Sequence, residues 1–529
     1  MTAAGGRAGD TISAMAAAAA HRFGDRLAIV DGDRRISHAE LFDEARSFAG
    51  ALVASGIEAG DRVAIWAPNS REWVVALLGL LQAGATLVPI NTRFKGGEAA
   101  EILARSGARA LVTVTDFLGV DHLDMLRRSG IDLPAVETVV VAGPAPDDAE
   151  PWHRFLGRAD HAAGTEVDRR RAALEAGTPS DLLFTSGTTG APKGVMMTHG
   201  RTLRVAIDWV EMTGLGADDR YLMVNPYFHM FGLKAGILAC LVSGAIMFPE
   251  PVFDVDRALR RVAEERITVF PGAPTIYQSI LDHPARDRLD LSSLRVAVTG
   301  AADIPVQLIR RMDAELPFST IITGYGLTEA GTVTATSPSD DPETIATTVG
   351  QARPGYELRI VGPDLADVPA GEPGEVVVRS PTVMVGYLDD PGATAEALSD
   401  GWLRTGDIGV LDAERRLRIV GRSKDMFIVG GFNAYPAEIE NTLLRHPDVQ
   451  RAAVIGIPDT RLGAVGMAFV VSRSSDDGVG PAILSWCREQ MANYKVPRVI
   501  EIVPELPVNA TGKVVKDELR ARVAHRVPQ

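Results

Sequence analysis

Short apolar runs rich in β-branched residues alternate with helical stretches from residue 27 to residue 300, and this alternation constrains the fold more strongly than any other feature of the chain. The runs "LAIV" at 27–30, "RVAIW" at 62–66 and "ALVTV" at 110–114 are typical of strands. Ser37 and Glu40 have the spacing of a capping box, which predicts a helix that begins there and ends near Ser55. Strands and helices in alternation predict a parallel sheet covered by helices.

A second block repeats this pattern after residue 230. Three helices alternate there with three strands, and the expected ranges are 234–242, 245–248, 254–265, 267–270, 274–281 and 295–300. The sequence therefore predicts two βα-layered sheets. Ahead of both blocks, the alanine-rich stretch at 13–25 is interpreted as a helix, because it lacks the basic segment and cleavage pattern of a signal peptide.

The sequence pattern of the chain changes after residue 345. Short runs such as "YELRIV", "GEVVVRS" and "RLRIVG" are separated by turn residues, which predicts antiparallel strands or a small β-barrel. A compact segment follows in which "PAEIENTLLRH" and "AILSWCREQM" are expected as helices, and "RAAVIGIP" and "GMAFVVS" as strands. These features predict a separate α+β domain whose boundary lies near 422–426.

The charge of the chain excludes some classes of partner. A net charge of −14 argues against broad binding to nucleic acid or anionic membranes, since both need a large basic surface. A polyanionic small ligand needs only a local basic patch, and residues 488–526 hold eight Lys or Arg against five Asp or Glu. This patch suits such a ligand, although a solvated surface is the alternative interpretation.

Two further features bear on the cellular location. The most apolar run, Trp73–Ile90, is interrupted by Gln82, Gly84 and Pro89, and it falls short of the ~20 apolar residues that a membrane helix needs. Both cysteines of the chain stand in apolar surroundings, so they are expected to be core thiols in a reducing compartment. The predicted location is the cytoplasm.

The segment "TSGTTGAPKG" at 185–194 predicts an anion site between two strands. Its glycines permit positive φ and close approach, so that successive N–H groups can turn toward one anion. The hydroxyls add donors and Lys193 adds a positive charge. The segment is not a Walker A loop, because Pro192 stands where the second glycine would be and no Ser or Thr follows Lys193. A hydroxyl-rich turn without a ligand is the alternative that the residues alone leave open.

This segment resembles the phosphate loop of the adenylate-forming superfamily, which comprises acyl-CoA synthetases, peptide-synthetase adenylation domains and luciferases. Other segments resemble signatures of the same superfamily, in its order along the chain. They are "LQAGATLVPI" (81–90), "GYGLTE" (324–329), "GEVVVRSPTVMVGYLDDP" (374–391), "LRTGDIG" (403–409), "GRSKDMFIVGGFN" (421–433) and "PVNATGK" (507–513). The resemblance covers nearly the whole chain.

The resemblance implies a fold and a set of domains. An N-terminal adenylation domain over 1–421 would contain the two layered sheets and the barrel-like part. A hinge over 422–425, with Lys424 at its centre, would lead to a mobile C-terminal domain over 426–529. The hinge would let the C-terminal domain rotate between two steps of a reaction, which needs only a few residues to change φ and ψ.

The resemblance also implies a role for each matching residue. Lys193 and the phosphate loop would hold the β- and γ-phosphates of ATP, Tyr325 would stack on adenine, Asp407 would accept the ribose hydroxyls, and Lys513 would meet the charge between carboxylate and α-phosphate. The full set expected to bind ATP is Thr185, Ser186, Gly187, Thr188, Thr189, Gly190, Lys193, Gly300, Ala301, Ala302, Gly324, Tyr325, Gly326, Thr328, Asp407, Arg422 and Lys513.

Glu329 and Thr185 are the expected ligands of Mg²⁺, since oxygen ligands suit that hard ion. A solvated carboxylate for Glu329, a turn-capping carboxylate for Asp407 and a solubilising amine for Lys513 are the alternatives.

The acid is expected in a pocket lined by Tyr227, His229, Phe231, Gly232, Thr299, Gly324 and Gly331. His229, with Lys193 and Lys513, completes the expected catalytic set. The segments that contribute these residues are rich in Gly, Ala and Thr, so they leave room for a compact hydrophobic monocarboxylic acid. The runs "NPYFHMFGLKAGILACL" and "FPGAPTIYQSILDHPARDRLDLSSLRVAVTGAADIP" resemble ligases that activate an indane-propanoate in bacterial steroid catabolism.

The function that follows is an ATP-dependent carboxylic acid:CoA ligase, which forms acyl-AMP and pyrophosphate and then acyl-CoA. A bulky alicyclic acid is the leading substrate, and a medium-chain fatty or aryl acid is the alternative. An adenylating enzyme that passes its acyl group to a carrier protein and a non-enzymatic nucleotide sensor are the rival classes. The expected co-substrates and cofactor are ATP, coenzyme A and Mg²⁺, without nucleic acid or a membrane span. The oligomeric state stays open, with a homodimer as one option.

Overall fold

The computed structural model describes residues 10–524 apart from 148, 186–191, 301–303, 305, 423–424, 430–431, 460, 475, 477 and 510–512. An eight-stranded sheet has the order β18-β9-β8-β4-β3-β5-β6-β7. The strands β3 to β8 run parallel, whereas β9 forms an antiparallel hairpin with β8, as the sequence predicts. The bounds are β3 Arg62–Trp66, β4 Thr86–Pro89, β5 Ala110–Thr113, β6 Thr138–Val141, β7 Glu150–Pro151, β8 Pro179–Thr185, β9 Lys193–Thr198 and β18 Gly386–Tyr387.

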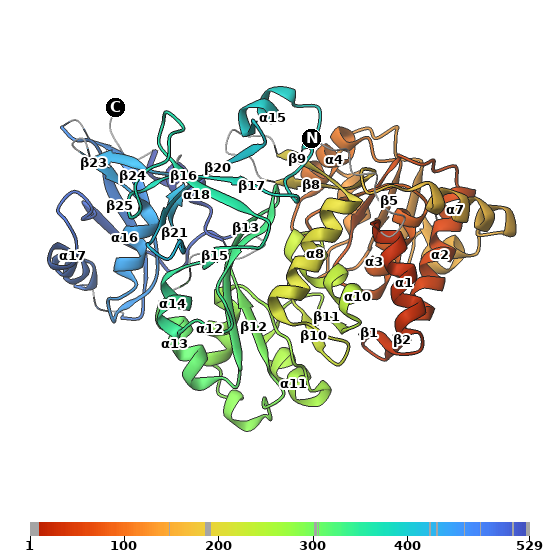
Figure 1. Ribbon diagram of the computed structural model, residues 1–529, viewed down its shortest axis with the longest axis horizontal. Coiled ribbons are helices and arrows are strands. Elements are labelled where there is room, and N and C mark those ends of the chain that lie inside the picture. The colour runs from red at the N-terminus through yellow and green to blue at the C-terminus, as the bar shows by residue number, and fades with distance from the viewer. Residues whose placement is uncertain are drawn as a thin grey trace.

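Helices cover this sheet (Figure 1). The predicted capping box is confirmed, because the Ser37 amide donates to Glu40 Oε2 at 2.8 Å and the Glu40 amide donates to Ser37 Oγ at 3.2 Å. The alanine-rich stretch also forms a helix, as predicted. The bounds are α1 Ile12–Phe23, α2 His38–Ala54, α3 Arg71–Gln82, α4 Gly96–Ser106, α5 His122–Arg127, α6 Trp152–Leu156, α7 His161–Ala173 and α8 His199–Thr213.

The second layer consists of two four-stranded sheets with the orders β10-β11-β1-β2 and β12-β13-β14-β15. Their bounds are β1 Leu27–Asp31, β2 Arg34–Ser37, β10 Arg220–Met223, β11 Ile246–Pro249, β12 Val296–Thr299, β13 Thr320–Leu327, β14 Gly331–Ala335 and β15 Gln351–Ala352. The segment predicted as a strand at 267–270 forms isolated bridges at Val269, to Tyr221 and Val296, and not a regular strand. Pro271 has no N–H group to donate, and the pairing with β12 resumes at Gly272, whose amide donates to the carbonyl oxygen of Val298 at 3.0 Å.

The helices of this layer occur close to the predicted ranges, with one difference. The helix expected at 234–242 begins as a π-helix, η1, and becomes α-helical only at Ala239. The bounds are α9 Met230–Gly232, η1 Leu233–Leu238, α10 Ala239–Ser243, α11 Val255–Glu265, α12 Pro274–Leu281, η2 Arg286–Arg288, α13 Val306–Glu315 and α14 Pro342–Thr347.

A fourth, antiparallel sheet follows, as the change of pattern predicts. Its order is β16-β17-β20-β19, and β21 pairs with the same edge of β20 as β19. The bounds are β16 Glu357–Val361, β17 Gly374–Arg379, α15 Pro391–Ala397, β19 Leu398–Ser399, β20 Trp402–Leu411 and β21 Leu417–Arg422. The pairing of β20 with β21 sets Asp407 opposite Arg422, which places two predicted site residues together.

The C-terminal segment builds its own sheet and helices, as predicted. The sheet order is β23-β22-β25-β24, and β26 pairs in parallel with β25. Its buried clusters draw only on residues from Phe427 onward. The bounds are β22 Phe427–Val429, β23 Phe432–Ala434, α16 Pro436–Leu443, β24 Val449–Asp459, β25 Gly463–Ser472, α17 Val479–Gln490, β26 Val499–Ile502 and α18 Lys516–Ala524. In Figure 1 this segment lies beside the sheet of β16, β17 and β20 and away from α1 to α7.

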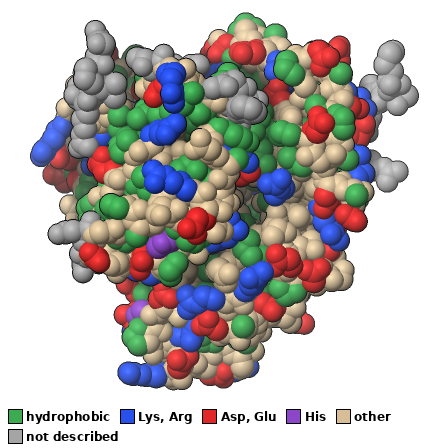
Figure 2. Space-filling model, turned by 90° about the vertical axis from the view of Figure 1, so that its left-hand side faces the viewer, with side chains coloured by type: hydrophobic (Ala, Val, Ile, Leu, Met, Phe, Trp, Pro, Cys, Tyr) green, Lys and Arg blue, Asp and Glu red, His purple; other side chains and the backbone are tan. Residues whose placement is uncertain are grey.

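Both cysteines are free and buried, which confirms the prediction of core thiols. Within the described ranges, no helix has the length and apolarity needed to cross a bilayer. On the face shown in Figure 2, Lys and Arg side chains are interspersed with Asp and Glu side chains. This mixture agrees with the exclusion of a broad basic surface.

Candidate active site

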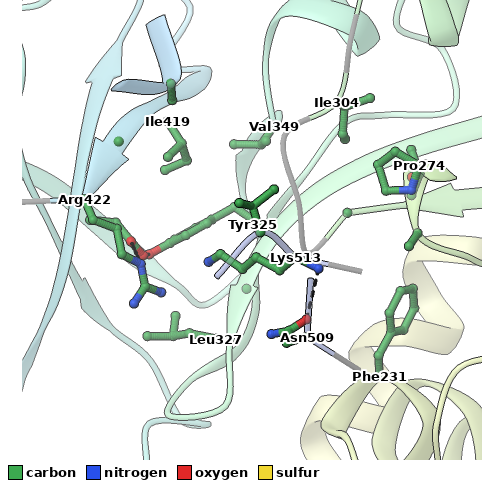
Figure 3. A pocket seen from close by; sticks show the side chains of 18 of the residues that line it. Phe231, Pro274, Ile304, Tyr325, Leu327, Val349, Ile419, Arg422, Asn509 and Lys513 are labelled. Carbon is green, nitrogen blue, oxygen red and sulfur yellow. Dashed lines mark hydrogen bonds and ion pairs between the residues drawn. The ribbon is translucent and has the colours of Figure 1, made fainter. Parts of the chain in front are cut away.

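A cavity of about 1570 Å³ lies where three of the four sheets of the N-terminal part meet the C-terminal segment. Residues from β8, β9, α12, β13, β20, β21 and the loop before α18 line it. Figure 3 shows two sides of this cavity: Tyr325, Arg422 and Lys513 on one, Phe231 and Pro274 on the other. The cavity therefore joins a polar half to an apolar half.

Asp407 is the centre of the polar half and is only 5% exposed. The Tyr325 phenol donates to Asp407 Oδ2 at 2.6 Å, and Arg422 Nε lies 3.0 Å from Asp407 Oδ1. Burial, followed by the charge of Asp407, raises the pKa of Tyr325, so the phenol stays protonated and remains the donor. The pairing of β20 with β21 sets Asp407 opposite Arg422, and β13 carries Tyr325 to the same place.

Glu329 lies in a second polar group of the same cavity. Tyr387 donates to Glu329 Oε1 at 3.1 Å, and Lys193 Nζ lies 5.0 Å from the centre of the Tyr387 ring. Burial raises the pKa of Glu329 above its usual range, and the hydrogen bond from Tyr387 and the charge of Arg422 offset this only in part. A divalent cation in the cavity would lower that pKa again.

The residues present fit Mg²⁺ bound partly by phosphate. Among the described residues, no group of three His, Cys, Asp or Glu side chains could hold a metal ion by itself. Mg²⁺ commonly binds through one or two carboxylates together with substrate phosphates, and Glu329, which shares Tyr387 with Lys193, matches that need. Thr185 also lines the cavity, where its hydroxyl donates to the carbonyl oxygen of Lys193 at 3.4 Å.

The phosphate loop itself can be described only at its ends. Arg105 of α4 donates to the carbonyl oxygen of Pro192 at 2.6 Å and holds the returning end of the loop. The predicted ligands Ser186, Gly187, Thr188, Thr189 and Gly190 lie outside the described residues. The same holds for Ala301, Ala302 and the predicted hinge residue Lys424.

Lys513 lines the cavity from the C-terminal segment, and two hydrogen bonds join it to Asn509. The Lys513 amide donates to Asn509 Oδ1 at 3.0 Å, and the Asn509 amide donates to the carbonyl oxygen of Lys513 at 2.8 Å. Val508 and Val514 form a β-bridge at the base of the turn. Figure 3 shows the Lys513 side chain on the side of the cavity that holds Tyr325 and Arg422. The C-terminal segment thus supplies a cation to a site built mainly by the N-terminal part.

The apolar half is built around His229 and Phe231, which precede the π-helix. Phe231 packs edge-to-face on Trp209 of α8, with ring centres 5.3 Å apart. His229 Nδ1 accepts a hydrogen bond from the Phe231 amide at 3.2 Å, and burial lowers the pKa of His229 to about 4. The imidazole is therefore neutral near pH 7 and offers no positive charge to a carboxylate.

Several other predicted residues line the cavity, namely Thr299, Gly300, Gly324, Gly326 and Thr328. Tyr227, Gly232 and Gly331 were predicted for the acid pocket but do not line it. Tyr227 is fully buried and packs edge-to-face on Trp73. A Cβ atom on Gly232 would lie 2.2 Å from the carbonyl oxygen of Pro226. Gly331 has φ of +71°, and its Cβ atom would meet Val205 at 2.6 Å. These three residues serve backbone and core packing instead.

Tyr387 and Trp209 are among the cavity residues that escaped prediction. Tyr387 stands inside a recognised motif, and its aromatic side chain among small and acidic neighbours was an available signal. Trp209 lies on α8, more than 20 residues from Phe231 in the chain, and no local pattern connects the two.

A second cavity of about 480 Å³ adjoins the first. His229, Phe231, Ala273, Thr275 and Gly300 line both cavities, so they form the wall between them. The second cavity also has the exposed cations Arg93 and Lys95 among its lining residues. It therefore offers a separate approach to the wall at His229.

Comparisons with known proteins agree with this geometry. The profile of the family "AMP-binding enzyme" matches residues 16–388, and that of "AMP-binding enzyme C-terminal domain" matches residues 438–513. A curated relative from Rhodococcus jostii, the 3-[(3aS,4S,7aS)-7a-methyl-1,5-dioxo-octahydro-1H-inden-4-yl]propanoyl:CoA ligase, is 49% identical over 95% of this chain and 96% of its own length.

Solved structures share the fold across both parts of the chain. The anthranilate CoA ligase AuaEII in complex with anthranoyl-AMP has a TM-score of 0.85 and 30% identity, over 98% of this chain and 100% of its own. ATP-bound MatB from Rhodopseudomonas palustris has a TM-score of 0.83 and 28% identity, over 97% and 99%. The predicted fold class, a large α/β N-terminal domain followed by a small α+β domain, is confirmed.

Proposed function

The chain belongs to the AMP-binding enzyme family as an AMP-forming acid:CoA ligase, and we propose that its acid is a compact alicyclic monocarboxylic acid carrying a propanoate side chain. The observation that carries this proposal is the joint cavity, in which an ATP-sized polar half opens onto an apolar half walled by Phe231 and Trp209. The 49% identity to the indane-propanoyl:CoA ligase supports the ring-containing acid.

In the first step, the acid carboxylate attacks the α-phosphate of ATP, and pyrophosphate leaves. Tyr325 supplies a flat face for adenine, and Asp407, held by Tyr325 and Arg422, presents its remaining lone pairs to the ribose hydroxyls. Lys193 would hold the outer phosphates, and Lys513 would lie against the charge that develops between the two anions. Glu329 and Thr185 would hold Mg²⁺, which neutralises phosphate charge when it is bound.

In the second step, the CoA thiol displaces AMP from the acyl carbon. The second cavity suits the approach of CoA, because Arg93 and Lys95 can pair with its phosphates and the wall at His229 adjoins the acyl site. A neutral His229, whose Nδ1 accepts from the Phe231 amide, can donate one hydrogen bond there from Nε2 without repelling Lys513. CoA and the acid would thus reach the reacting carbon from different sides.

The hinge at 422–425, centred on Lys424, remains part of this proposal. Arg422 is its first residue and binds Asp407, while Asp425 is its last residue and lies 2.5 Å from Arg520 of α18. The two ion pairs anchor the chain to the N-terminal and C-terminal parts respectively. A rotation at 422–425 would withdraw Lys513 after the first step, and this is the reason for separating domains at 1–421 and 426–529.

The acid proposal is tested by pyrophosphate release with a panel of carboxylic acids, followed by detection of the acyl-CoA product. The panel includes a bicyclic propanoate, anthranilate, octanoate, acetate and palmitate. The bicyclic propanoate should have the highest kcat/KM, and acetate and palmitate should be poor. A preference for octanoate or anthranilate would replace the alicyclic acid with a medium-chain or aryl acid. Pyrophosphate release without acyl-CoA formation would favour transfer to a carrier protein instead.

A further inference from the structure

Lys234 and Asp181 form an ion pair inside the protein, apart from both cavities. Lys234 Nζ lies 3.1 Å from Asp181 Oδ2, and the two side chains are only 1% and 3% exposed. Neither residue lines a cavity, and neither matches a role in the two-step reaction. A buried pair of charges without a catalytic role needs another explanation.

The pair joins two segments that build different halves of the active site. Asp181 lies on β8, the strand that leads to Thr185 and the phosphate loop. Lys234 lies on the π-helix η1, directly after the segment that carries His229 and Phe231 into the cavity wall. The pair therefore links the wall of the acid pocket to the base of the phosphate loop.

The Asp181 carboxylate is held from a third element as well. Thr202 of α8 donates to Asp181 Oδ1 at 2.7 Å, and the Ser180 hydroxyl lies 3.3 Å from Thr202 Oγ1. His199 lies near this carboxylate, but burial lowers its pKa to about 4, so it is neutral near pH 7. Lys234 is therefore the cation that balances Asp181.

Stability alone does not account for this pair. Removing two charges from water is costly, and replacing a buried ion pair with apolar side chains of similar volume is often neutral or stabilising. Charge attraction does, however, hold the ammonium and the carboxylate at a short distance from each other, which apolar packing does not impose. This makes it suited to fixing the position of one segment relative to another.

The segment that Lys234 anchors is an unusual one. A π-helix inserts an extra residue into a helical turn, and such insertions are frequent at functional sites. A Cβ atom on Gly236 would lie 2.9 Å from Met223 Cε, so the helix also packs closely on the end of β10. Small shifts of this helix would move His229 and Phe231 directly.

We propose that the Lys234–Asp181 pair positions the acid-binding wall, so that Lys234 is a positioning residue for acid selectivity. The inference rests on the proposed ligase function, and it adds that a buried contact outside the pocket sets the pocket's shape. It also means that Lys234 is not a partner for a second carboxylate on the substrate. Its ammonium is already held by Asp181 in the protein interior.

The main test is the double variant Lys234→Met/Asp181→Leu, which removes both charges while nearly keeping their volume. A single variant would leave one buried charge and could unfold the protein. Arg295→Met/Asp219→Asn is the matched control, because Arg295 pairs with Asp219 at 2.6 Å, both charges are removed together and neither residue lines a cavity. Thr202→Val, which weakens the hold on Asp181 without stranding a charge, is the second test should the double variant fail to fold.

The expected result separates acid binding from ATP binding. The KM for the preferred acid should rise about tenfold in the double variant, since small misplacements of a binding wall carry large kinetic costs, and the KM for ATP should change less than about twofold. The preference for that acid over butanoate should fall, and Thr202→Val should move both values in the same direction. Arg295→Met/Asp219→Asn should lower the melting temperature without changing this preference.

A second readout needs no substrate. Amide hydrogen exchange of the ligand-free protein should speed up in the peptides covering 228–238 in the double variant, and not in those covering 71–82. Unchanged exchange at 228–238 together with an unchanged acid preference would overturn the positioning role, and so would equal increases in the KM for acid and ATP. A failure of the parent enzyme to use any ring-containing acid would contradict the proposed substrate. The hydrogen-exchange measurement would still test the positioning role in that case.

Discussion

Tyr325 Oη donates a hydrogen bond to Asp407 Oδ2 across 2.6 Å, so the residue expected beneath adenine and the residue expected beside the ribose are already joined in the protein. Arg422 holds the other oxygen of the same carboxylate at 3.0 Å. The nucleoside site is thus preorganised by groups that come from three strands. Preorganised polar groups lose little by reorienting when a ligand binds.

Asp407→Ala should raise the KM for ATP by about tenfold to a hundredfold, because a hydrogen bond to a charged group contributes about 1.5–3 kcal/mol. The measurement is initial-rate kinetics at saturating acid. Tyr325→Phe keeps the ring and frees one Asp407 oxygen, so it should raise this KM far less. Asp367→Ala, on an exposed loop of the same sheet, is the control. Equal effects of Asp407→Ala and Asp367→Ala would contradict the ribose role.

Glu329→Gln should increase the Mg²⁺ concentration needed for the half-maximal rate. The contacts of Asp407 with the nucleoside should be unchanged. The effect of Glu329→Gln on stability has a definite sign. Burial raises the pKa of Glu329, so its favourable contribution is complete below its unfolded pKa and is lost as the pH rises through the folded value. Gln imitates the protonated form, and the melting temperature at pH 7.5 should therefore rise. Glu396→Gln, at an exposed position of the same cavity, should do neither.

Lys513→Ala should slow acyl-AMP formation by about a hundredfold to a thousandfold, as expected for the loss of one group that stabilises developing charge. Conversion of supplied acyl-AMP to acyl-CoA should be nearly unaffected, because the lysine acts on the first transition state only. Asn509→Ala removes the hydrogen bond to the Lys513 amide and should give a smaller loss in the same step. Equal losses in both half-reactions would show that Lys513 has a different role.

His229 should make the protein sensitive to acid. Burial lowers the pKa of His229 to about 4, whereas the usual pKa of a histidine is about 6.5. Between these two pH values the unfolded chain therefore binds more protons than the folded chain. The stability associated with His229 is present above this window and is lost as the pH falls through it. The melting temperature of His229→Gln should therefore fall less than that of the parent between pH 6.5 and pH 4.5. His161→Gln, at an exposed position, should behave like the parent.

Lys424→Pro should impair mainly the second half-reaction, because proline fixes φ at the proposed hinge and restricts rotation. Lys424→Ala should retain both half-reactions and serves as the control for loss of the side chain. The measurement is single-turnover formation of acyl-AMP and of acyl-CoA in the same preparation. Normal CoA-dependent turnover in Lys424→Pro would place the hinge elsewhere.

The local sequence was sufficient for most of the elements and for the polar half of the site. Capping by Ser37 and Glu40, the hairpin of β8 and β9, and the strand that carries Asp407 depend on neighbours in the chain, so short patterns predict them. The motif that contains Glu329 was recognised because the motifs follow each other along the chain in the order typical of the family. These interactions are local or are carried by recognisable segments.

Other features depended on contacts between distant segments. The strand expected at 267–270 reduces to bridges at Val269, and the predicted pocket residues Tyr227, Gly232 and Gly331 serve packing instead of the cavity. Side chains that face a cavity and side chains that face the core can stand next to each other in one turn. Periodicity does not tell them apart at that scale, because the choice depends on what packs opposite.

The sequence alone determined the layered α/β architecture, the separate C-terminal domain and the adenylate-forming family, because periodicity and motif order are properties of the chain. The tertiary structure alone decided that Tyr387 meets Glu329, that Trp209 supports Phe231 and that Lys234 is buried against Asp181. Each of these pairs joins residues more than 20 positions apart. Their contacts exist only because folding removes both partners from water together, and the burial that follows sets their charges and their geometry.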